Sequence, residues 1–187
     1  MRTVILGNSG SGKTWLAERL ASGTSGTSVP AVHLDELFWQ PGGFDQKRLP
    51  TETASLIKTA RAAPGWVVEG VFGELATSFL EDASALIWLD LDWTVCEARL
   101  RARGSESKAH MARPQSEAGL MALLEWASTY QNRDDSMSFA GHLALFQAFD
   151  GPKVRFSNEK EVSAFLEAVE RKGMLVALQV NAERPPC

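Results

Sequence analysis

The sequence predicts an α/β fold in which a five-stranded parallel sheet lies between two layers of helices. Short apolar segments alternate with segments of helical periodicity along most of the 187 residues. The first apolar segment also ends in a glycine-rich turn that leads directly into a helical segment. Strands that alternate with helices form a parallel sheet covered on both faces, and this arrangement gives three layers.

The predicted strands are short apolar runs bounded by turn residues: Thr3–Leu6, Val29–Leu34, Trp66–Val68, Ala85–Leu89 and Val154–Phe156. The predicted helices cover Lys13–Ala21, Thr51–Ala62, Thr94–Arg103, Glu117–Tyr130 and Glu159–Arg171. The polar stretch Gly104–Pro114 has no periodicity and is expected to pass over an active site. We expect one domain over residues 1–172, with an insertion at about 104–140, and a tail over 173–187 that frays at its end.

The composition limits the classes of function. The net charge is −4 and the sequence pI is about 5.4, whereas non-specific nucleic-acid binding normally shows as a basic surface. No segment approaches the ~18 apolar residues of a membrane span, and no signal peptide is recognisable. Cys96 and Cys187 show neither a metal spacing nor a disulfide framework. These features favour a cytoplasmic monomer or homodimer that binds small molecules and no membrane.

A phosphate-binding loop is the most specific motif. The segment Gly7-Asn8-Ser9-Gly10-Ser11-Gly12-Lys13-Thr14 matches the pattern G-x-x-x-x-G-K-[ST], between a strand and a helix. Its glycines let backbone N–H groups point at phosphate oxygens, and the following helix adds the positive end of its dipole. Lys13 is expected to reach the β- and γ-phosphates, and the Thr14 hydroxyl to ligate Mg²⁺. The sequence therefore predicts a P-loop that binds Mg-ATP.

Acidic residues follow three of the predicted strands. Asp90 either holds a magnesium-bound water or caps the turn that follows it. Glu69 is a second candidate for the magnesium shell, and Asp35 is a candidate for substrate binding. Each could instead be a solvated loop carboxylate. A function is favoured for Glu69 and Asp35, because ligands of parallel sheets bind at the carboxyl edge.

Two arginines and two aromatic residues complete the candidate site. Arg99 and Arg103 lie four residues apart on one helix face, where they would either stabilise a transferring phosphoryl group or form a solvated basic face. Phe38 and Trp39 follow Asp35 and could form an aromatic wall over a substrate. The histidines show no metal spacing and are assigned no role: His33, His110 and His142.

In this order, the motifs resemble those of the adenylate-kinase-like branch of P-loop kinases. Within that branch the chain is most similar to small bacterial DNA topology modulation (FlaR-related) proteins. The resemblance runs from Val4 to about Leu166. It is carried by the P-loop, His33-Leu34-Asp35-Glu36-Leu37-Phe38-Trp39, Trp66-Val67-Val68-Glu69-Gly70, Leu86-Ile87-Trp88-Leu89-Asp90, and Ser157-Asn158.

The resemblance implies a mobile helical lid and roles for several residues. Arg99 and Arg103 would contact the ATP phosphates and the transferring group, and Glu69 would lie close to magnesium. Ser157 and Asn158 would lie near the adenine. On the acceptor side the resemblance adds Gly70 and Arg133 to the substrate site.

The chain also departs from adenylate kinases where they bind the AMP phosphate. Gly73 occupies the position of one arginine in that family, and a second falls near Phe38. Burying a phosphate dianion without partners is costly. A hydroxyl acceptor, with Asp35 taking its proton, is therefore favoured. Alternatively, Lys47 and Arg48 could supply the contacts to an acceptor phosphate. We predict an ATP-dependent kinase of a small hydroxyl-bearing or nucleotide-like acceptor. The alternative is a regulatory P-loop ATPase, related to DNA topology, that has no small-molecule acceptor.

Overall fold

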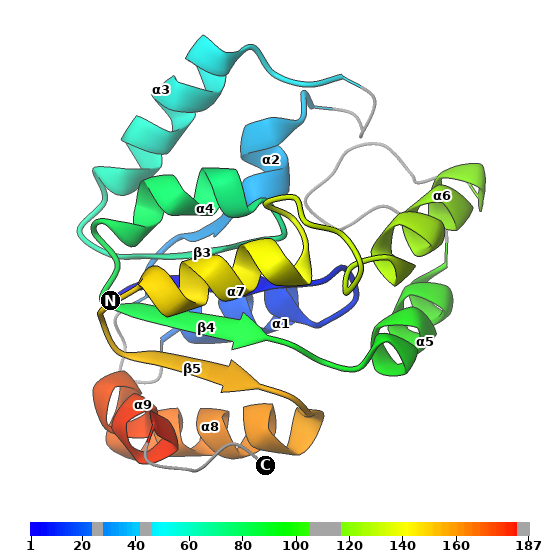
Figure 1. Ribbon diagram of the computed structural model, residues 1–187. Coiled ribbons are helices and arrows are strands. Elements are labelled where there is room, and N and C mark those ends of the chain that lie inside the picture. The colour runs from blue at the N-terminus through cyan, green and yellow to red at the C-terminus, as the bar shows by residue number, and fades with distance from the viewer. Residues whose placement is uncertain (24–27, 42–45, 105–116, 183–187) are drawn as a thin grey trace.

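The structure, a computed structural model, describes residues 1–23, 28–41, 46–104 and 117–182. Its five strands are β1 (Arg2–Gly7), β2 (Ala31–His33), β3 (Trp66–Gly70), β4 (Ala85–Leu89) and β5 (Lys153–Phe156). All neighbouring strands are parallel, in the order β2-β3-β1-β4-β5 (Figure 1). The predicted parallel sheet is confirmed, and β1, which leads into the P-loop, is its central strand.

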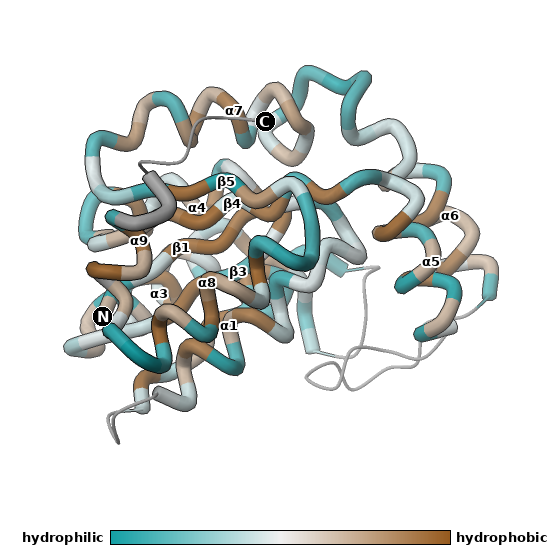
Figure 2. Tube along the Cα trace, turned by 90° about the horizontal axis from the view of Figure 1, so that it is seen from below, coloured by the Kyte–Doolittle hydropathy of each residue, from teal (hydrophilic) through white to brown (hydrophobic). Residues whose placement is uncertain are grey.

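Helices cover both faces of the sheet. One layer holds α1 (Lys13–Ala21), α8 (Glu159–Lys172) and α9 (Met174–Ala182), and the other holds α2 (Leu34–Phe38), α3 (Pro50–Arg61), α4 (Gly73–Leu80) and α7 (Phe139–Ala148). Figure 2 shows the sheet between α7 on one side and α1 and α8 on the other. Along β1, Ile5 packs into the first layer, whereas Val4 and Leu6 pack into the second. This alternation across a sheet buried on both faces explains why the strands are apolar throughout.

Two further helices lie beyond the carboxyl end of the sheet. These are α5 (Trp93–Arg103) and α6 (Glu117–Ser128), which pack together through Leu100, Leu124 and Ala127 (Figure 1). The Asp92 side chain caps α5 by accepting a hydrogen bond from the Thr94 N–H at 2.8 Å. These helices bring residues from the second half of the chain to the P-loop edge.

Four helices were not predicted, and one of them corrects an expectation. Helix α7 carries no clear amphipathic period, and α2 and α4 are only five and eight residues long, too short to show the period over several turns. Residues 173–187 were expected to be a tail, but Met174–Ala182 forms α9, whose Ala177 and Leu178 are buried in the core with α8. The expected frayed end at 183–187 lies outside the described residues. So does most of the polar stretch in the expected lid, including His110.

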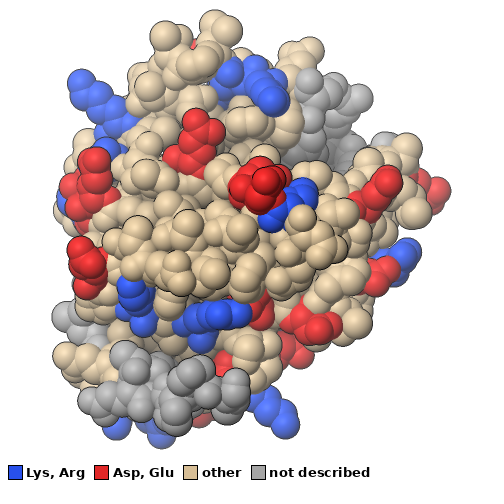
Figure 3. Space-filling view, in the orientation of Figure 1, with Lys and Arg blue, Asp and Glu red and all other residues tan. Residues whose placement is uncertain are grey.

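Two surface features bear on function. Among the described residues, no helix is both long and apolar enough to cross a membrane. On the face shown in Figure 3, lysine and arginine side chains are interspersed with carboxylates and form no continuous basic surface.

Candidate active site

The P-loop is held in a tight conformation by two glycines with positive φ. Gly10 has φ of 83° and Gly12 has φ of 93°, values that residues with a Cβ rarely adopt. A Cβ on Gly10 would lie 2.4 Å from the backbone oxygen of Cys96 in α5. Glycine at this position is therefore required both by the backbone conformation and by the close approach of α5.

Arg99 binds the outside of the P-loop. Its Nη1 donates hydrogen bonds to the carbonyls of Ser11 at 2.9 Å and Gly10 at 3.3 Å, and its Nη2 pairs with Glu159 at the start of α8. In a trans peptide the carbonyl and the next N–H point in opposite directions. The N–H of Gly12 therefore points away from Arg99. The structure thus places Arg99 on backbone carbonyls of the loop, whereas the sequence analysis expected it to contact the ATP phosphates.

Lys13 and Asn8 link the P-loop to itself and to α6. The buried Lys13 ammonium donates to the Asn8 carbonyl at 2.8 Å. The Asn8 side chain donates to the Ala127 carbonyl in α6 at 2.9 Å and accepts from the Ser9 N–H at 2.8 Å. The side chain of Asn8 thus supports the loop. The Ser11 hydroxyl is buried and has no hydrogen-bond partner among the described residues.

A buried polar cluster lies beside the first turn of α1. The Thr14 hydroxyl donates to Glu69 Oε1 at 2.9 Å, and His33 Nδ1 lies 2.8 Å from the same oxygen. Glu69 is 1% exposed and His33 is 9% exposed. The structure thus joins Thr14 to Glu69, two residues that the sequence analysis proposed for the magnesium site, and adds His33, to which it gave no role. The only sequence signal for His33 was its place immediately before Leu34 and Asp35, at the end of a predicted strand.

Asp35 in α2 and Arg103 in α5 are close enough to interact electrostatically. Asp35 is buried and lies inside α2, because β2 ends earlier than predicted, at His33. Burial lowers the pKa of Arg103, and attraction to Asp35 partly opposes this shift. The Nε of Arg103 is buried and has no hydrogen-bond partner among the described residues. A half-buried guanidinium with spare donors is suited to an anion.

Glu36 is a second carboxylate beside this cluster, and the sequence analysis did not list it as a site residue. Burial raises its pKa, His33 lowers it, and the neighbouring carboxylates of Asp35 and Glu69 raise it further. Arg48, whose Nε donates to the Glu36 carbonyl at 2.9 Å, lowers it.

The predicted aromatic wall is part of the packing of α2. The ring of Phe38 stacks on Phe72 with centroids 4.4 Å apart, and Lys47 Nζ lies 5.3 Å from the Phe38 centroid. Trp39 meets Phe38 edge-on at 4.7 Å. A Cβ on Gly70 would lie 2.6 Å from the Cβ of Leu34, so glycine allows β3 to approach α2 closely. Phe38 and Trp39 are both half-buried and pack against the same hydrophobic cluster.

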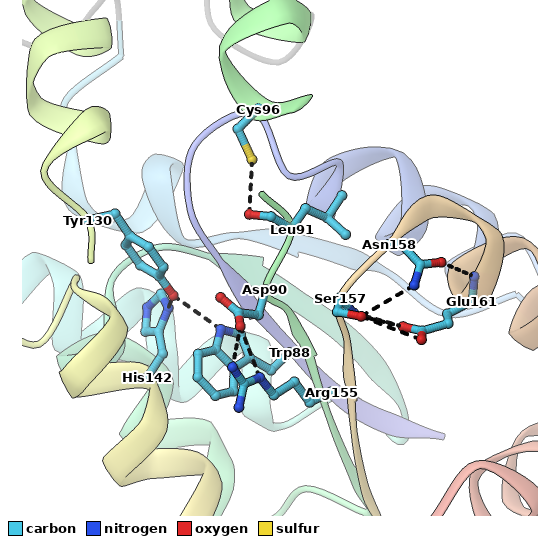
Figure 4. Close-up of polar contacts among 10 residues, drawn as sticks. All are labelled: Trp88, Asp90, Leu91, Cys96, Tyr130, His142, Arg155, Ser157, Asn158 and Glu161. Carbon is cyan, nitrogen blue, oxygen red and sulfur yellow. Dashed lines mark hydrogen bonds and ion pairs between the residues drawn. The ribbon is translucent and has the colours of Figure 1, made fainter. Parts of the chain in front are cut away.

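Asp90 pairs with Arg155 at the carboxyl end of β4 (Figure 4). Arg155 Nε donates to Asp90 Oδ2 at 3.0 Å, and the guanidinium lies 4.5 Å from the ring centroid of Trp88. Asp90 Oδ1 is buried without a hydrogen-bond partner among the described residues. The structure therefore gives Asp90 an ion pair with β5, and one oxygen remains for a further donor.

Beneath Asp90, three side chains form a buried hydrogen-bonded chain (Figure 4). Trp88 Nε1 donates to the Tyr130 hydroxyl at 3.1 Å, and that hydroxyl lies 2.7 Å from His142 Nδ1. His142 Nε2 lies 2.9 Å from the Val71 carbonyl, which can only accept. The neutral histidine therefore carries its proton on Nε2, and Tyr130 donates to Nδ1. Burial lowers the pKa of His142 to about 4.

The last three predicted site residues have structural partners. Asn158 caps α8, accepting from the Glu161 N–H at 3.0 Å, and the Ser157 N–H donates to the Glu161 carboxylate at 2.8 Å. Arg133 lies 4.0 Å from the Trp126 ring centroid and donates to the Met137 carbonyl at 3.0 Å. Because α8 also pairs with Arg99 through Glu159, Ser157 and Asn158 begin a helix attached to the P-loop, whereas Arg133 holds the turn between α6 and α7.

The described residues contain no group of three His, Cys, Asp or Glu side chains placed to hold a metal ion. A Mg²⁺ ion that arrives with a nucleotide is usually held by substrate phosphates, waters and one or two protein oxygens. Thr14 and Glu69 can supply that small number of oxygens.

Comparisons with known proteins give limited information. No protein-family model and no curated protein matches the sequence. Among solved structures, a gluconokinase from Sinorhizobium meliloti 1021 has 17% identity and a TM-score of 0.47, covering 97% of this chain and 93% of its own. A shikimate kinase from Bacteroides thetaiotaomicron has 14% identity and a TM-score of 0.45, covering 91% of this chain and 96% of its own. A deoxyadenosine kinase from M. mycoides has 12% identity and a TM-score of 0.46, covering 92% of this chain and 98% of its own.

Identities and TM-scores this low assign no substrate. The strand order and the P-loop on the central strand nevertheless define the class by themselves: the chain has a three-layer P-loop fold.

Proposed function

We propose that the protein is a phosphotransferase that moves the γ-phosphoryl group of Mg-ATP to a small hydroxyl-bearing or nucleotide-like acceptor. The observation that carries this proposal is the meeting of two sets of groups at one edge of the sheet. Lys13 and Thr14 begin α1 beside Glu69, and Arg103 lies within electrostatic range of the buried Asp35. A phosphate cradle next to a cation and a candidate base is the arrangement that phosphoryl transfer requires.

The P-loop would bind the phosphates of ATP. Its N–H groups and the positive end of α1 attract the phosphate oxygens. Lys13 would exchange its bond to the Asn8 carbonyl for the β- and γ-phosphates. When bound through Thr14 and the phosphates, Mg²⁺ neutralises charge on the transferring group. Glu69 would hold the Thr14 hydroxyl, and the remaining oxygen of Asp90 would accept from a water near the metal.

Arg103 and Asp35 would act on the transfer itself. The guanidinium of Arg103 would stabilise charge on the phosphoryl oxygens, and Asp35 would orient the acceptor hydroxyl and take its proton. Trp39 would line the acceptor side. Arg99 would act through the loop carbonyls that it holds. Ser157 and Asn158 would lie near the adenine, as the resemblance to adenylate-kinase-like proteins implies.

The test is ADP release from Mg-ATP, measured with and without pools of nucleosides, nucleotides, sugars and sugar acids, with Lys13→Ala as the blank. The proposal predicts that one pool raises ADP release by the wild-type protein. No pool should raise ADP release by the Lys13→Ala variant. A flat response to every pool, with ATP still bound, would support the regulatory alternative. A salt-sensitive DNA gel shift would support it too, although no basic surface is visible on the face in Figure 3.

A further inference from the structure

The hydrogen bond between Thr14 and Glu69 is one half of a three-residue arrangement. Glu69 Oε1 lies 2.9 Å from the Thr14 hydroxyl and 2.8 Å from His33 Nδ1. The three residues come from the first turn of α1, from β3 and from the last position of β2. His33 and Glu69 are direct partners in the parallel register of β2 and β3, so the backbone of the sheet fixes their separation. The contact is thus built into the sheet.

The direction of each hydrogen bond follows from the chemistry of the groups. A threonine hydroxyl has one proton and two lone pairs. When Thr14 donates its proton to Glu69, both lone pairs face away from the carboxylate and can serve a cation. A hydroxyl that turned its proton toward the cation could not ligate it. Glu69 therefore selects the rotamer of the Thr14 hydroxyl that suits magnesium.

His33 in turn determines where Glu69 places its oxygen. Glutamate has three side-chain torsions, and one hydrogen bond from a rotating hydroxyl does not fix them. A second donor on the same oxygen does fix them, because strand pairing holds His33 in place. The site is also buried, with Glu69 1% exposed and His33 9% exposed. From these contacts we infer that His33 is a positioning residue. Acting through Glu69, it orients the Thr14 hydroxyl toward the magnesium ion of Mg-ATP. This inference rests on the proposed function for its metal and nucleotide, but it needs no acceptor.

The test compares ATP binding to the full chain in Mg²⁺ and in EDTA, by titration calorimetry. The dissociation constant in EDTA divided by the dissociation constant in Mg²⁺ gives the factor by which magnesium strengthens ATP binding. Residues that orient a metal ligand typically affect metal affinity 10- to 100-fold. We expect His33→Leu to reduce the ratio by about tenfold or more and to leave binding in EDTA unchanged. A merely structural role would weaken binding in both conditions alike.

Two variants test the mechanism. In His33→Asn the amide nitrogen takes the place of Nδ1, so we expect the ratio to stay within about threefold of wild type; His33→Gln places its nitrogen one bond further out and should behave like His33→Leu. In a Thr14→Val background, His33→Leu should have no further effect on the ratio, because the hydroxyl that it orients is gone. The asparagine and glutamine pair keeps the test decisive if the leucine variant does not fold.

A matched control is Thr53→Val. This change removes the hydrogen bond from the Thr53 hydroxyl to the Leu37 carbonyl, 2.9 Å long, which also supports α2 but does not reach Thr14. The ratio should not change. The inference is overturned if His33→Leu keeps the wild-type ratio, if His33→Asn loses as much as His33→Gln, or if wild type gains nothing from magnesium. By contrast, a normal ratio without phosphorylation of any acceptor would reject only the proposed kinase activity.

Discussion

Acid should destabilise the protein through His142, and the size of the effect follows from the buried chain that contains it. Protonating Nδ1 would force that nitrogen to donate to the Tyr130 oxygen, which already accepts from Trp88. The tyrosine proton would then have no acceptor in this chain. Burial lowers the pKa of His142 to about 4, and the hydrogen bond that protonation would break also disfavours the charged ring in the folded state.

The sign and magnitude of the effect follow from linkage. The unfolded chain, in which the histidine pKa is about 6.5, takes up a proton as the pH falls below that value, whereas the folded state resists protonation down to about 4. The stabilising contribution of neutral His142 is therefore fully present above about pH 6.5 and is lost as the pH falls toward 4. Between about pH 7 and pH 5 the loss is about 2 kcal/mol.

The assay is urea unfolding followed by circular dichroism at a series of pH values, for wild type and His142→Gln. Glutamine does not titrate in this range, so the other ionisable groups cancel in the difference between the two proteins. The stability advantage of wild type should shrink by about 2 kcal/mol between about pH 7 and pH 5. Parallel loss of stability in both proteins would refute the assignment of a neutral, Nε2-protonated His142.

Three further substitutions test the buried chain and the P-loop. Tyr130→Phe leaves a buried indole N–H and a ring nitrogen without partners, so it should cost about 3 kcal/mol in urea unfolding; a loss below about 1 kcal/mol would contradict the hydrogen-bonded chain. Gly12→Ala forces a Cβ onto φ of 93° and to within 3.0 Å of Arg99 Nη1, and ATP affinity measured by calorimetry should fall more than about tenfold while the far-ultraviolet spectrum stays unchanged; wild-type affinity would argue against this loop conformation. Arg99→Lys keeps the charge but cannot reach Ser11 and Glu159 together, so ATP affinity should fall about tenfold; an unchanged value would show that the charge alone suffices.

Local signals were sufficient to predict the frame of the fold. The bounds of α1 and β4 agree with the predicted ranges. The P-loop motif marks the start of α1 at Lys13, and β4 is an uninterrupted apolar run that ends before Asp90. Helix α7 could not be predicted from an amphipathic period. Its ten residues are mainly apolar, so its sequence shows no preferred face.

Roles that depend on contacts between distant segments could not be predicted in the same way. The spacing of Arg99 and Arg103 predicted that they share one helix face, but it did not predict the partner of each. Arg99 binds the loop carbonyls, whereas Arg103 interacts electrostatically with Asp35. The contact between His33 and Glu69 depends on the register of two strands that are 36 residues apart in the chain. Nothing in the neighbourhood of His33 in the sequence encodes that register.

The hydrogen bond from Asn8 to Ala127 has a consequence for the order of folding. It joins two residues separated by 119 positions, and the Asn8 carbonyl also accepts a hydrogen bond from the Lys13 ammonium. Closing so long a segment costs chain entropy that only later contacts repay. The P-loop therefore cannot gain this support until α6 has been made and docked. A nascent chain that ends before α6 has the whole nucleotide motif in its sequence but lacks this anchor for its loop.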